Sequence, residues 1–361
     1  MRVAYTYVKS LTNKKYITTM ELANIDWGSL GFGFMPTDYN VRCNYSNGKW
    51  GELEVHAEAT MPMHISAAVL HYAQECFEGL KAFRGEDGKV RIFRIVENAK
   101  RMQSSCRGVC MPEFPIEKFE EAVLKVVKLN ARFIPPYETG ASLYIRPVLF
   151  GTTPLVGVKP ASEYTFVVFV TPVGPYFKGG FQTTPFMLSR KYDRAAPLGT
   201  GNLKVGGNYA AGMRATVDSH DMGYSAVFYI DPKEKKYIDE CGAANFFAIK
   251  GNSYITPKSD SILPSITNMS LRQIAEDLGM TVERRQIPIA ELAEFDEAGA
   301  CGTAAVISPI DKIVDVDENH TFQISKDGKP GKWCTKLYET LRGIQYGKVE
   351  DKHNWCTIVE L

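Results

Sequence analysis

A single lysine in a glycine-rich stretch is the first residue of this sequence that could do chemistry. Lys204 lies in 199–209 (GTGNLKVGGNY) and is the one charged side chain between Arg194 and Arg214, in a chain with 23% charged residues. A lysine among small and apolar residues is expected to be partly desolvated, which lowers its pKa and frees the amine to attack a carbonyl carbon. The alternative is an exposed lysine on a glycine loop, and this stretch alone does not decide between the two.

A lysine that forms a Schiff base usually serves pyridoxal phosphate, whose ring acts as an electron sink. That cofactor needs an anion site for its phosphate, and two stretches could present free N–H groups to an anion. The first is 263–267 (LPSIT), where a helix is expected to begin with Ser265 as its N-cap, and the second is the small turn 302–305 (GTAA). Each could equally be an ordinary helix cap or turn.

Two further residues could meet the other needs of such a cofactor. Glu240 directly follows the expected short strand 237–239, and a carboxylate there could keep the pyridine nitrogen protonated, although a solvated turn residue is the alternative. Tyr209 lies five residues after Lys204 and could donate to the phenolic oxygen, or could simply belong to the core. The glycines around Lys204 are expected to let the backbone pass close to the cofactor.

A possible substrate group lies on the strand predicted at 141–151. Tyr144 and Arg146 occupy alternate positions there, so both side chains are expected on the same face of the strand. A guanidinium beside an aromatic hydroxyl suits a carboxylate-bearing substrate, because arginine can pair with a carboxylate through two N–H groups. An exposed cross-strand pair is the alternative.

Other kinds of site lack their usual patterns. The six histidines show no ligand spacing and the eight cysteines include no Cys-x-x-Cys pair, so we predict no metal site and no dithiol motif. Neither Gly-x-Ser-x-Gly nor a Walker-type run occurs. The pair Gly199 and Gly201 is followed by Lys204 where a dinucleotide fingerprint has glycine, which argues against nicotinamide binding.

Length and charge favour a two-domain protein with small-molecule partners. The chain has 361 residues, more than a single core usually holds. Its formal net charge of +1 argues against a broad attraction to nucleic acid or to acidic membranes. Residues 1–15 lack the apolar run of a signal peptide, and no later segment is apolar for long enough to span a bilayer, so we predict a cytoplasmic protein.

Hydrophobic periodicity and turn signals predict a mixed α/β (α+β) fold that positions these residues. Helices are expected over 66–79, 98–107, 115–133, 208–220, 265–278 and 333–346. Strands are expected within 24–46, 80–93 (a hairpin), 141–151, 163–171, 224–230, 237–239, 245–249 and 253–255, with a strand or turn at 302–310. The Pro- and Gly-containing run 171–180 is expected to be a linker between domains at 1–170 and 181–361.

From about Phe32 to Tyr346, the sequence resembles the branched-chain amino acid aminotransferases of the class IV (fold type IV) pyridoxal-phosphate enzymes. The motifs that carry the resemblance are 70–72 (LHY), 77–79 (FEG), 98–102 (NAKRM), 143–147 (LYIRP), 204–209 (KVGGNY), Glu240 with Asn245, 263–264 (LP) and 302–304 (GTA). Each motif is weak alone, but in this order and spacing they are highly specific together. The resemblance implies a smaller N-terminal α/β domain and a larger, β-rich C-terminal domain that holds pyridoxal 5'-phosphate.

The resemblance also implies a role for each matching residue. Lys204 is expected to be the Schiff-base lysine and general base, and Glu240 to pair with the pyridine nitrogen. The expected cofactor site further contains Arg101 and Thr303 as phosphate ligands together with Ile266 and Thr267, and Tyr209 as donor to the phenolic oxygen. The expected substrate site contains Tyr72, Phe77, Tyr144, Arg146, Thr303 and Ala304, with Val156 and Val158 on a loop that reaches the neighbouring site of a homodimer.

The activity that the resemblance implies is reversible transamination of leucine, isoleucine or valine with 2-oxoglutarate. Two enzymes of the same fold, a D-amino acid aminotransferase and an aminodeoxychorismate lyase, are alternatives, and so is a protein that binds pyridoxal phosphate without catalysis. The sequence departs from some animal members at 305–308 (AVIS), where those members carry a Cys-x-x-Cys pair. We therefore expect no thiol switch at that position.

Overall fold

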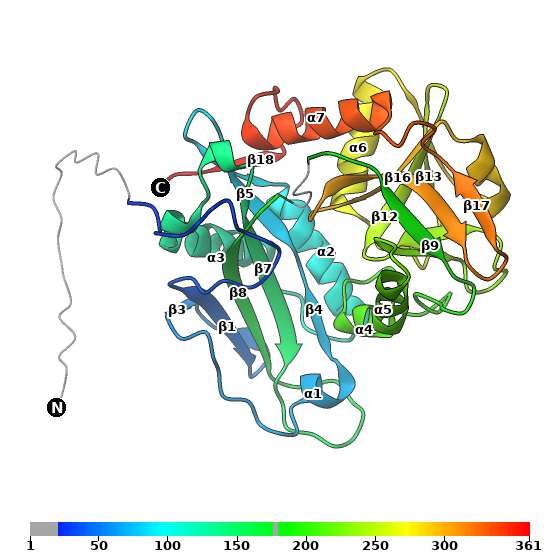
Figure 1. Cartoon of the computed structure of the whole chain (residues 1–361). Helices are drawn as coiled ribbons and strands as arrows, with labels where there is room; N and C mark the ends of the chain where they lie inside the picture. The colour runs from blue at the N-terminus through cyan, green and yellow to red at the C-terminus, as the bar shows by residue number, and fades with distance from the viewer. Residues whose placement is uncertain (1–20, 176–179) are drawn as a thin grey trace, which may run out of the picture.

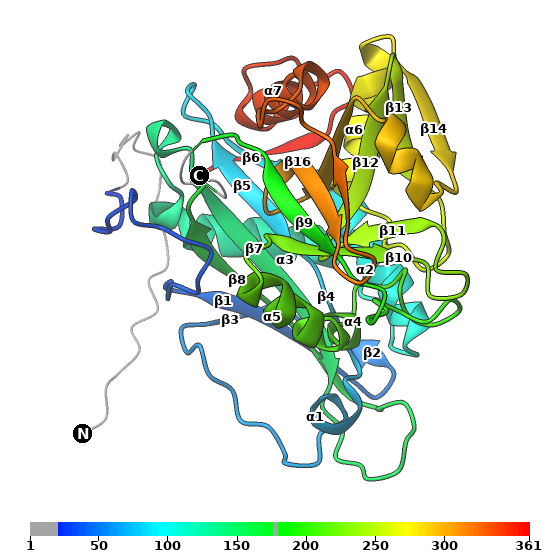
Figure 2. The same ribbon diagram turned by 45° about the vertical axis from the view of Figure 1, so that its right-hand side comes forward.

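The computed structural model describes residues 21–175 and 180–361 (Figure 1). The predictions made for 1–15, and for 176–179 within the expected linker, concern residues outside these ranges. The strands form two large sheets that lie beside each other, with helices packed around both (Figures 1 and 2). None of the helices in the described ranges is long and apolar enough to cross a membrane.

The first sheet contains the strands before residue 175 and one strand from the end of the chain. Its order is β18-β6-β5-β7-β8-β1-β2, with β3 beside β1 and β4 beside β7. The strands are β1 (Asn40–Ser46), β2 (Lys49–Trp50), β3 (Glu54–His56), β4 (Glu75–Phe77), β5 (Leu80–Arg84), β6 (Val90–Phe93), β7 (Ser142–Gly151), β8 (Tyr164–Val173) and β18 (Cys356–Val359). Both β4 and β5 pair with β7, and the short interruption between them contains Glu78 and Gly79.

The second sheet closes on itself. Its order is β11-β10-β9-β16-β15-β12-β13-β14, and an additional pairing between β11 and β12 joins six of these strands into a ring. The strands are β9 (Thr184–Leu188), β10 (Ala226–Ile230), β11 (Ile238–Cys241), β12 (Ala244–Lys250), β13 (Ser253–Pro257), β14 (Thr281–Arg285), β15 (Glu297–Gly302), β16 (Val306–Asp315) and β17 (His320–Gln323), which pairs with β16. Closure leaves β11, β12 and β15 adjacent, so the ends of these strands can contribute to one site.

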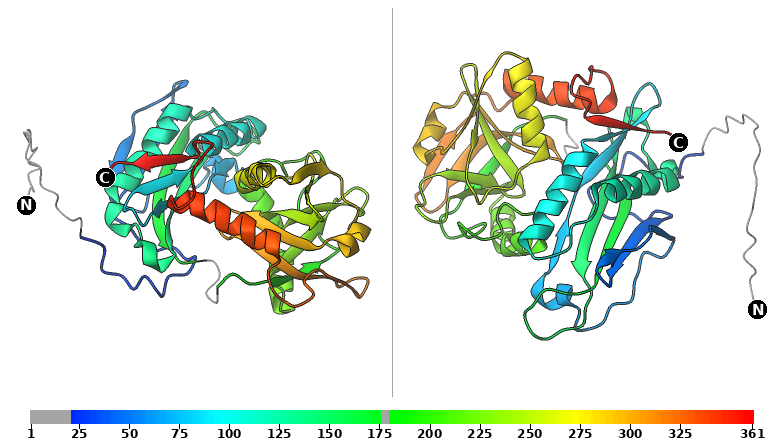
Figure 3. Two further views of the ribbon diagram at one scale, coloured as in Figure 1. Left: turned by 90° about the horizontal axis from the view of Figure 1, so that it is seen from above. Right: turned by 180° about the vertical axis from the view of Figure 1, so that it is seen from behind.

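Seven α-helices accompany the sheets in the described ranges. They are α1 (Ala68–Tyr72), α2 (Ile95–Gly108), α3 (Ile116–Leu129), α4 (Gly206–Ala211), α5 (Met213–Asp221), α6 (Ile266–Asp277) and α7 (Lys332–Tyr346), and 3-10 turns lie at Ala131–Phe133, Tyr137–Thr139 and Ile289–Glu294. Helices α2 and α3 cover one face of the first sheet (Figure 3). The predicted apolar face of α3 is confirmed, because Phe119, Val123, Val126 and Val127 are all buried.

The mixed α/β fold is confirmed, but the predicted secondary structure lacks several strands, among them β9, β14, β17 and β18, and one predicted helix is wrong. The helix predicted over 66–79 is only the single-turn α1, and the residues after it turn into β4. Ala73 ends α1 with a left-handed backbone, φ 47°, and the apolar residues that suggested a longer helix instead pack along β7. The expected linker at 171–180 begins inside β8, which runs to Val173. The division into domains stays a prediction, and β18 shows that the first sheet includes residues from beyond 181.

A shared hydrophobic cluster holds the two sheets together. Phe83 and Phe93 of the first sheet pack with Phe247 and Ile249 of β12, and α6 and α7 contribute further apolar side chains. The two sheets are therefore fixed against each other where β5 and β6 of the first sheet pack with β12 and β15 of the second. Cys301 of this cluster also lines the cavity that contains Lys204 and Glu240.

Candidate active site

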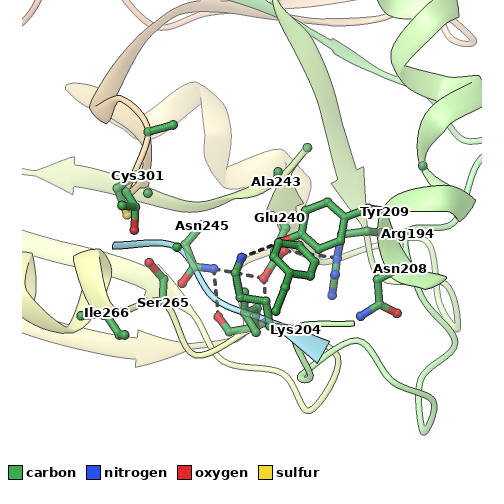
Figure 4. Close-up of a pocket in the computed structure, with 18 of the residues that line it drawn as sticks. Arg194, Lys204, Asn208, Tyr209, Glu240, Ala243, Asn245, Ser265, Ile266 and Cys301 are labelled. Atoms are coloured by element: carbon green, nitrogen blue, oxygen red, sulfur yellow. Dashed lines mark hydrogen bonds and ion pairs between the residues drawn. The ribbon is translucent and has the colours of Figure 1, made fainter. Parts of the chain in front are cut away.

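A cavity of about 260 Å³ lies between the two sheets and collects residues from distant parts of the chain. The first sheet supplies Phe77, Tyr144 and Arg146, and α2 supplies Arg101. The second half of the chain supplies Lys204, Tyr209, Glu240, Asn245, Ile266, Thr303 and Ala304. Figure 4 shows the part of the cavity in which Lys204, Tyr209 and Glu240 point toward one another.

Lys204 reaches the cavity from the loop before α4. Its Nζ donates a hydrogen bond to the Tyr209 hydroxyl at 2.9 Å and lies 4.7 Å from the centre of the Phe77 ring (Figure 4). Burial, together with the positive charge of Arg101, lowers the pKa of Lys204 to about 8. The amine therefore loses its proton far more readily than an exposed lysine does, as its charge-poor sequence surroundings predict.

The backbone around Lys204 is held by contacts on both sides. Ser105 of α2 accepts a hydrogen bond from the Lys204 amide at 3.0 Å, and the Lys204 carbonyl accepts one from the Phe77 amide at 3.0 Å. Two of the glycines in this stretch are required by close contacts within the protein. A Cβ at Gly201 would clash with the Ser261 carbonyl, and one at Gly206 would clash with the Glu75 carboxylate.

Glu240 is buried inside β11, which ends at Cys241, two residues later than the sequence predicts. Its Oε1 accepts hydrogen bonds from the Leu263 amide at 2.7 Å and from Asn245 Nδ2 at 3.0 Å. Burial raises the pKa of Glu240 to about 7, and the charge of Arg194 opposes that shift. A buried carboxyl group with such a pKa can exchange or share a proton near neutral pH.

Arg194 is a site residue that the sequence reasoning missed. It is buried and lines the cavity, and its Nε lies 3.3 Å from Glu240 Oε2 and 3.7 Å from Asp239 Oδ2. Its guanidinium also donates to the carbonyls of Gly201 and Ser261, so it ties the loop before Lys204 to β11. The only sequence signal was its position as the last charge before a charge-poor stretch.

Arg101 is anchored by a second buried carboxylate that was not assigned from the sequence. Its Nε and Nη2 donate to the two oxygens of Glu78 at 2.8 and 2.7 Å, and its Nη1 donates to the Pro264 carbonyl at 3.0 Å. A guanidinium has five N–H groups, so two remain available for an anion in the cavity. Glu78 lies within the motif 77–79, but its neighbours do not indicate that it is buried.

The start of α6 offers further N–H groups beside Arg101. Ser265 caps the helix as predicted, and its side chain accepts from the Asn268 amide at 3.2 Å. In the described ranges, the Ile266 and Thr267 amides have no hydrogen-bond acceptor, as expected for the first turn of a helix. Ile266 lines the cavity, whereas the buried Thr267 does not, so the two residues predicted as partners differ in their position.

Tyr144 and Arg146 share one face of β7, as the strand alternation predicts. Arg146 Nη2 donates to the Tyr144 hydroxyl at 3.0 Å, and the guanidinium lies 4.8 Å from the centre of the Phe77 ring. Arg146 Nε is buried and lacks a hydrogen-bond partner among the described residues. This end of the cavity can therefore accept an apolar group against aromatic rings, or a carboxylate at Arg146.

Three predicted substrate residues lie away from the cavity. Tyr72, Val156 and Val158 do not line it, and the Tyr72 hydroxyl contacts the Val156 carbonyl at the far tip of the first sheet. Val156 and Val158 are each 85% exposed, which is unusual for valine. Within one chain the structure therefore does not bring these residues to Lys204.

The residues in the cavity fit pyridoxal phosphate. Spare N–H groups at Arg101 and at the start of α6 suit its phosphate, and the buried Glu240 carboxyl suits its pyridine nitrogen. Burial raises the pKa of Tyr209 to about 12, so its hydroxyl keeps its proton and can donate to a phenolic oxygen. In the described ranges, no group of His, Cys, Asp or Glu side chains could hold a metal ion.

The chain is similar to proteins of known class. Residues 75–313 match the family described as amino-transferase class IV. A branched-chain-amino-acid aminotransferase of Helicobacter pylori is 46% identical over 337 residues, which cover 92% of this chain and 98% of that protein. A branched-chain amino acid aminotransferase of Escherichia coli has a similar structure, with a TM-score of 0.77, 26% identity and coverage of 90% of this chain and all of that one.

Proposed function

Because this chain belongs to the class IV aminotransferases, in the branched-chain amino acid aminotransferase family, we propose that it transfers the amino group of leucine, isoleucine or valine reversibly to 2-oxoglutarate. The observation that carries the proposal is that one cavity contains both Lys204 and Glu240, with Arg146 at its edge. A nucleophilic amine, a buried acid and an arginine beside aromatic rings are what this reaction requires.

Pyridoxal 5'-phosphate is the proposed cofactor, and when bound it would supply the electron sink for changes at the substrate Cα. Arg101, Ile266, Thr267 and Thr303 would hold its phosphate, and Glu240 its pyridine nitrogen. Lys204 would act as the base: with a lowered pKa, its Nζ would take the proton from the substrate Cα and release it to the cofactor C4′ in the same half-reaction. Tyr209 holds that Nζ in place through the 2.9 Å hydrogen bond.

The proposed substrate site has an apolar part and a charged part. Phe77 and Tyr144 would contact a branched aliphatic side chain, and the Thr303 and Ala304 amides would bind the α-carboxylate. When glutamate replaces the branched-chain substrate, its second carboxylate would pair with Arg146, whose Nε otherwise lacks a partner among described residues. One site can then serve both substrates in turn.

We also propose that the protein is a cytoplasmic homodimer in which the loop with Val156 and Val158 completes the site of the neighbouring chain. Support comes from the exposure of these valines, together with Ile65 and Leu70 nearby on the same tip of the first sheet. Tyr72 contacts this loop, so it would enter the neighbouring site with the valines. Burial of these side chains against a second copy would remove an apolar surface from water.

A half-reaction with single amino acids tests the activity. The protein loaded with pyridoxal phosphate is mixed with L-leucine, L-isoleucine, L-valine, L-glutamate, D-alanine or D-glutamate, and the conversion to the pyridoxamine form is followed by absorbance. We expect rapid conversion with the four L-amino acids and none with the D-amino acids. Conversion by D-alanine would instead identify a D-amino acid aminotransferase. No conversion with any of them would exclude an aminotransferase and leave the same-fold lyase and the non-catalytic binding protein.

A further inference from the structure

A second buried lysine lies close to the cavity, but no step of the proposed reaction uses it. Lys81 is the second residue of β5, is only 5% exposed and lies opposite Tyr144 of β7 in the sheet register. Its Nζ donates a hydrogen bond to the Ala304 carbonyl at 2.7 Å. In the described part of the chain, the charged side chain that acts on Lys81 is Arg342 of α7, and no carboxylate is paired with it. A buried ammonium group without an acidic partner needs an explanation.

The carbonyl that Lys81 holds belongs to the turn between β15 and β16. Ala304 forms part of the wall between the active-site cavity and a smaller cavity of about 140 Å³, which Lys81 and Arg342 line. No acceptor within the described ranges is bonded to the Thr303 and Ala304 amides, so both can bind a ligand. Val306, just after the turn, has φ 66°, a backbone conformation that a β-branched residue rarely adopts. Such a turn keeps its shape only when its surroundings hold it.

We propose that Lys81 is a positioning residue for the α-carboxylate of the substrate. By holding the Ala304 carbonyl it fixes the turn whose Thr303 and Ala304 amides bind that carboxylate, and its ammonium group places a positive charge behind them. A hydrogen bond from a charged donor is stronger than one between neutral groups, so lysine fixes the turn better than a neutral side chain of similar size does. This inference rests on the proposed function, because it concerns the same carboxylate site.

The environment of Lys81 gives the proposal a pH dependence. Arg342 and Tyr338 of α7, Tyr144 of β7 and the ring of Phe32 face this side of β5. Burial, with a smaller effect from Arg342, lowers the pKa of Lys81 to about 7. The ammonium is therefore present below neutral pH and is lost as the pH rises through about 7. Carboxylate binding should weaken over the same interval.

Binding of 4-methylpentanoate, a carboxylate with a leucine-like chain and no amino group, tests the proposal directly. The cofactor-loaded protein is titrated with it between pH 6 and pH 9, as wild type and as Lys81→Arg, Lys81→Gln and Lys81→Met. We expect Lys81→Met to weaken binding by about tenfold or more at pH 6 and to remove much of the pH dependence. Lys81→Arg should retain most of the affinity, and Lys81→Gln, which keeps a donor but no charge, should be intermediate.

Steady-state kinetics separates positioning from general damage. Leucine and 2-oxoglutarate both carry an α-carboxylate, so KM should rise for both in Lys81→Met while kcat changes less. Lys125→Met is the matched control, because the Lys125 side chain on α3 is partly exposed and forms a surface ion pair with Glu121 at 3.6 Å. The control should behave as wild type in both assays.

Two results separate failure of this inference from failure of the proposed function. If wild-type protein converts leucine but Lys81→Met binds 4-methylpentanoate with unchanged affinity and pH profile, the role of Lys81 is wrong and the function stands. If wild-type protein does not convert leucine, the proposed function fails and the inference fails with it. Should Lys81→Met not fold, as judged by cofactor content and melting temperature, the comparison of Lys81→Arg with Lys81→Gln decides, because equal affinities at pH 6 would overturn the role of the charge.

Discussion

Two lysines, the partly buried Lys204 and the buried Lys81, lie on either side of the Thr303–Ala304 turn, and desolvation lowers the pKa of both. Lys204 comes from a glycine-rich loop, lines the larger cavity and donates to the hydroxyl of Tyr209. Lys81 comes from a strand, lines the smaller cavity and donates to a backbone carbonyl. Their pKa values, about 8 and about 7, are similar and do not assign their roles.

The difference lies in what each amine can reach. A tyrosine hydroxyl can accept from an ammonium group or donate to a neutral amine, so Lys204 keeps its partner when it loses its proton. The Ala304 carbonyl can only accept, and it holds Lys81 turned toward the turn. Desolvation makes a lysine reactive, but it reacts only where its amine faces a cavity that a substrate can enter. The predictions below test that distinction.

The largest expected effect is loss of turnover in Lys204→Ala. Removing both the nucleophile and the base should reduce kcat by at least about a thousandfold while the protein still folds and binds pyridoxal phosphate. The measurement is the half-reaction with leucine, together with the visible absorbance of the lysine-bound cofactor, which the variant should lack. Borohydride reduction of the wild-type protein followed by peptide mapping should find the cofactor attached to Lys204 and not to Lys81. Attachment to Lys81 would mean that Lys81, and not Lys204, is the reactive lysine.

Glu240→Gln tests the carboxyl group of Glu240, which lines the same cavity as Lys204. In the described ranges, no carboxylate is paired with Lys81. An amide has nearly the same shape but cannot balance a protonated pyridine nitrogen, so we expect a loss in kcat on the order of a hundredfold with near-normal cofactor binding. Glu240→Asp should recover part of this loss. A Gln variant with wild-type kcat would mean that Glu240 is only a structural partner of Leu263 and Asn245.

Arg146→Ala tests whether a cation at the edge of the cavity chooses between substrates. The guanidinium is proposed to pair only with the side-chain carboxylate of glutamate or 2-oxoglutarate, so we expect kcat/KM to fall by about tenfold for these and by less than about threefold for leucine. Half-reaction rates with leucine and glutamate measure the two effects separately. Equal losses for both substrates would contradict this division of the site.

The smallest effect concerns stability. Lys81 has a pKa of about 7 in the folded protein and an ordinary value of 10.5, so between these pH values the unfolded chain binds more protons and wild-type stability rises with pH. Methionine has no titrating group, so the free energy of unfolding of Lys81→Met should not change with pH through this site. Relative to wild type, the Lys81→Met variant should therefore be more stable at pH 6 than at pH 9, by about 2 kcal/mol. Urea unfolding at both pH values measures this, with Lys125→Met as control. If the difference in unfolding free energy between Lys81→Met and wild type were the same at pH 6 and pH 9, Lys81 would not be desolvated.

Sequence patterns predicted the site better than they predicted the parts that hold it. The desolvation of Lys204 and the shared face of Tyr144 and Arg146 follow from local composition and from strand alternation, which are short-range signals. Arg194 and Glu78 were missed because their burial depends on contacts between segments far apart in the chain. For the same reason the helix predicted at 66–79 was wrong, since pairing with β7 outweighs the local helical pattern.

The position of β18 affects the order in which the protein can be completed during synthesis. Strand β6 is made early, yet its partner on one side is β18, which leaves the ribosome only after the whole second sheet has been made. Until then β6 presents an unpaired edge, which is a surface that promotes association with other chains. The two halves therefore cannot be separated by cutting the chain near residue 175, because the first piece would lack the strand that covers its edge.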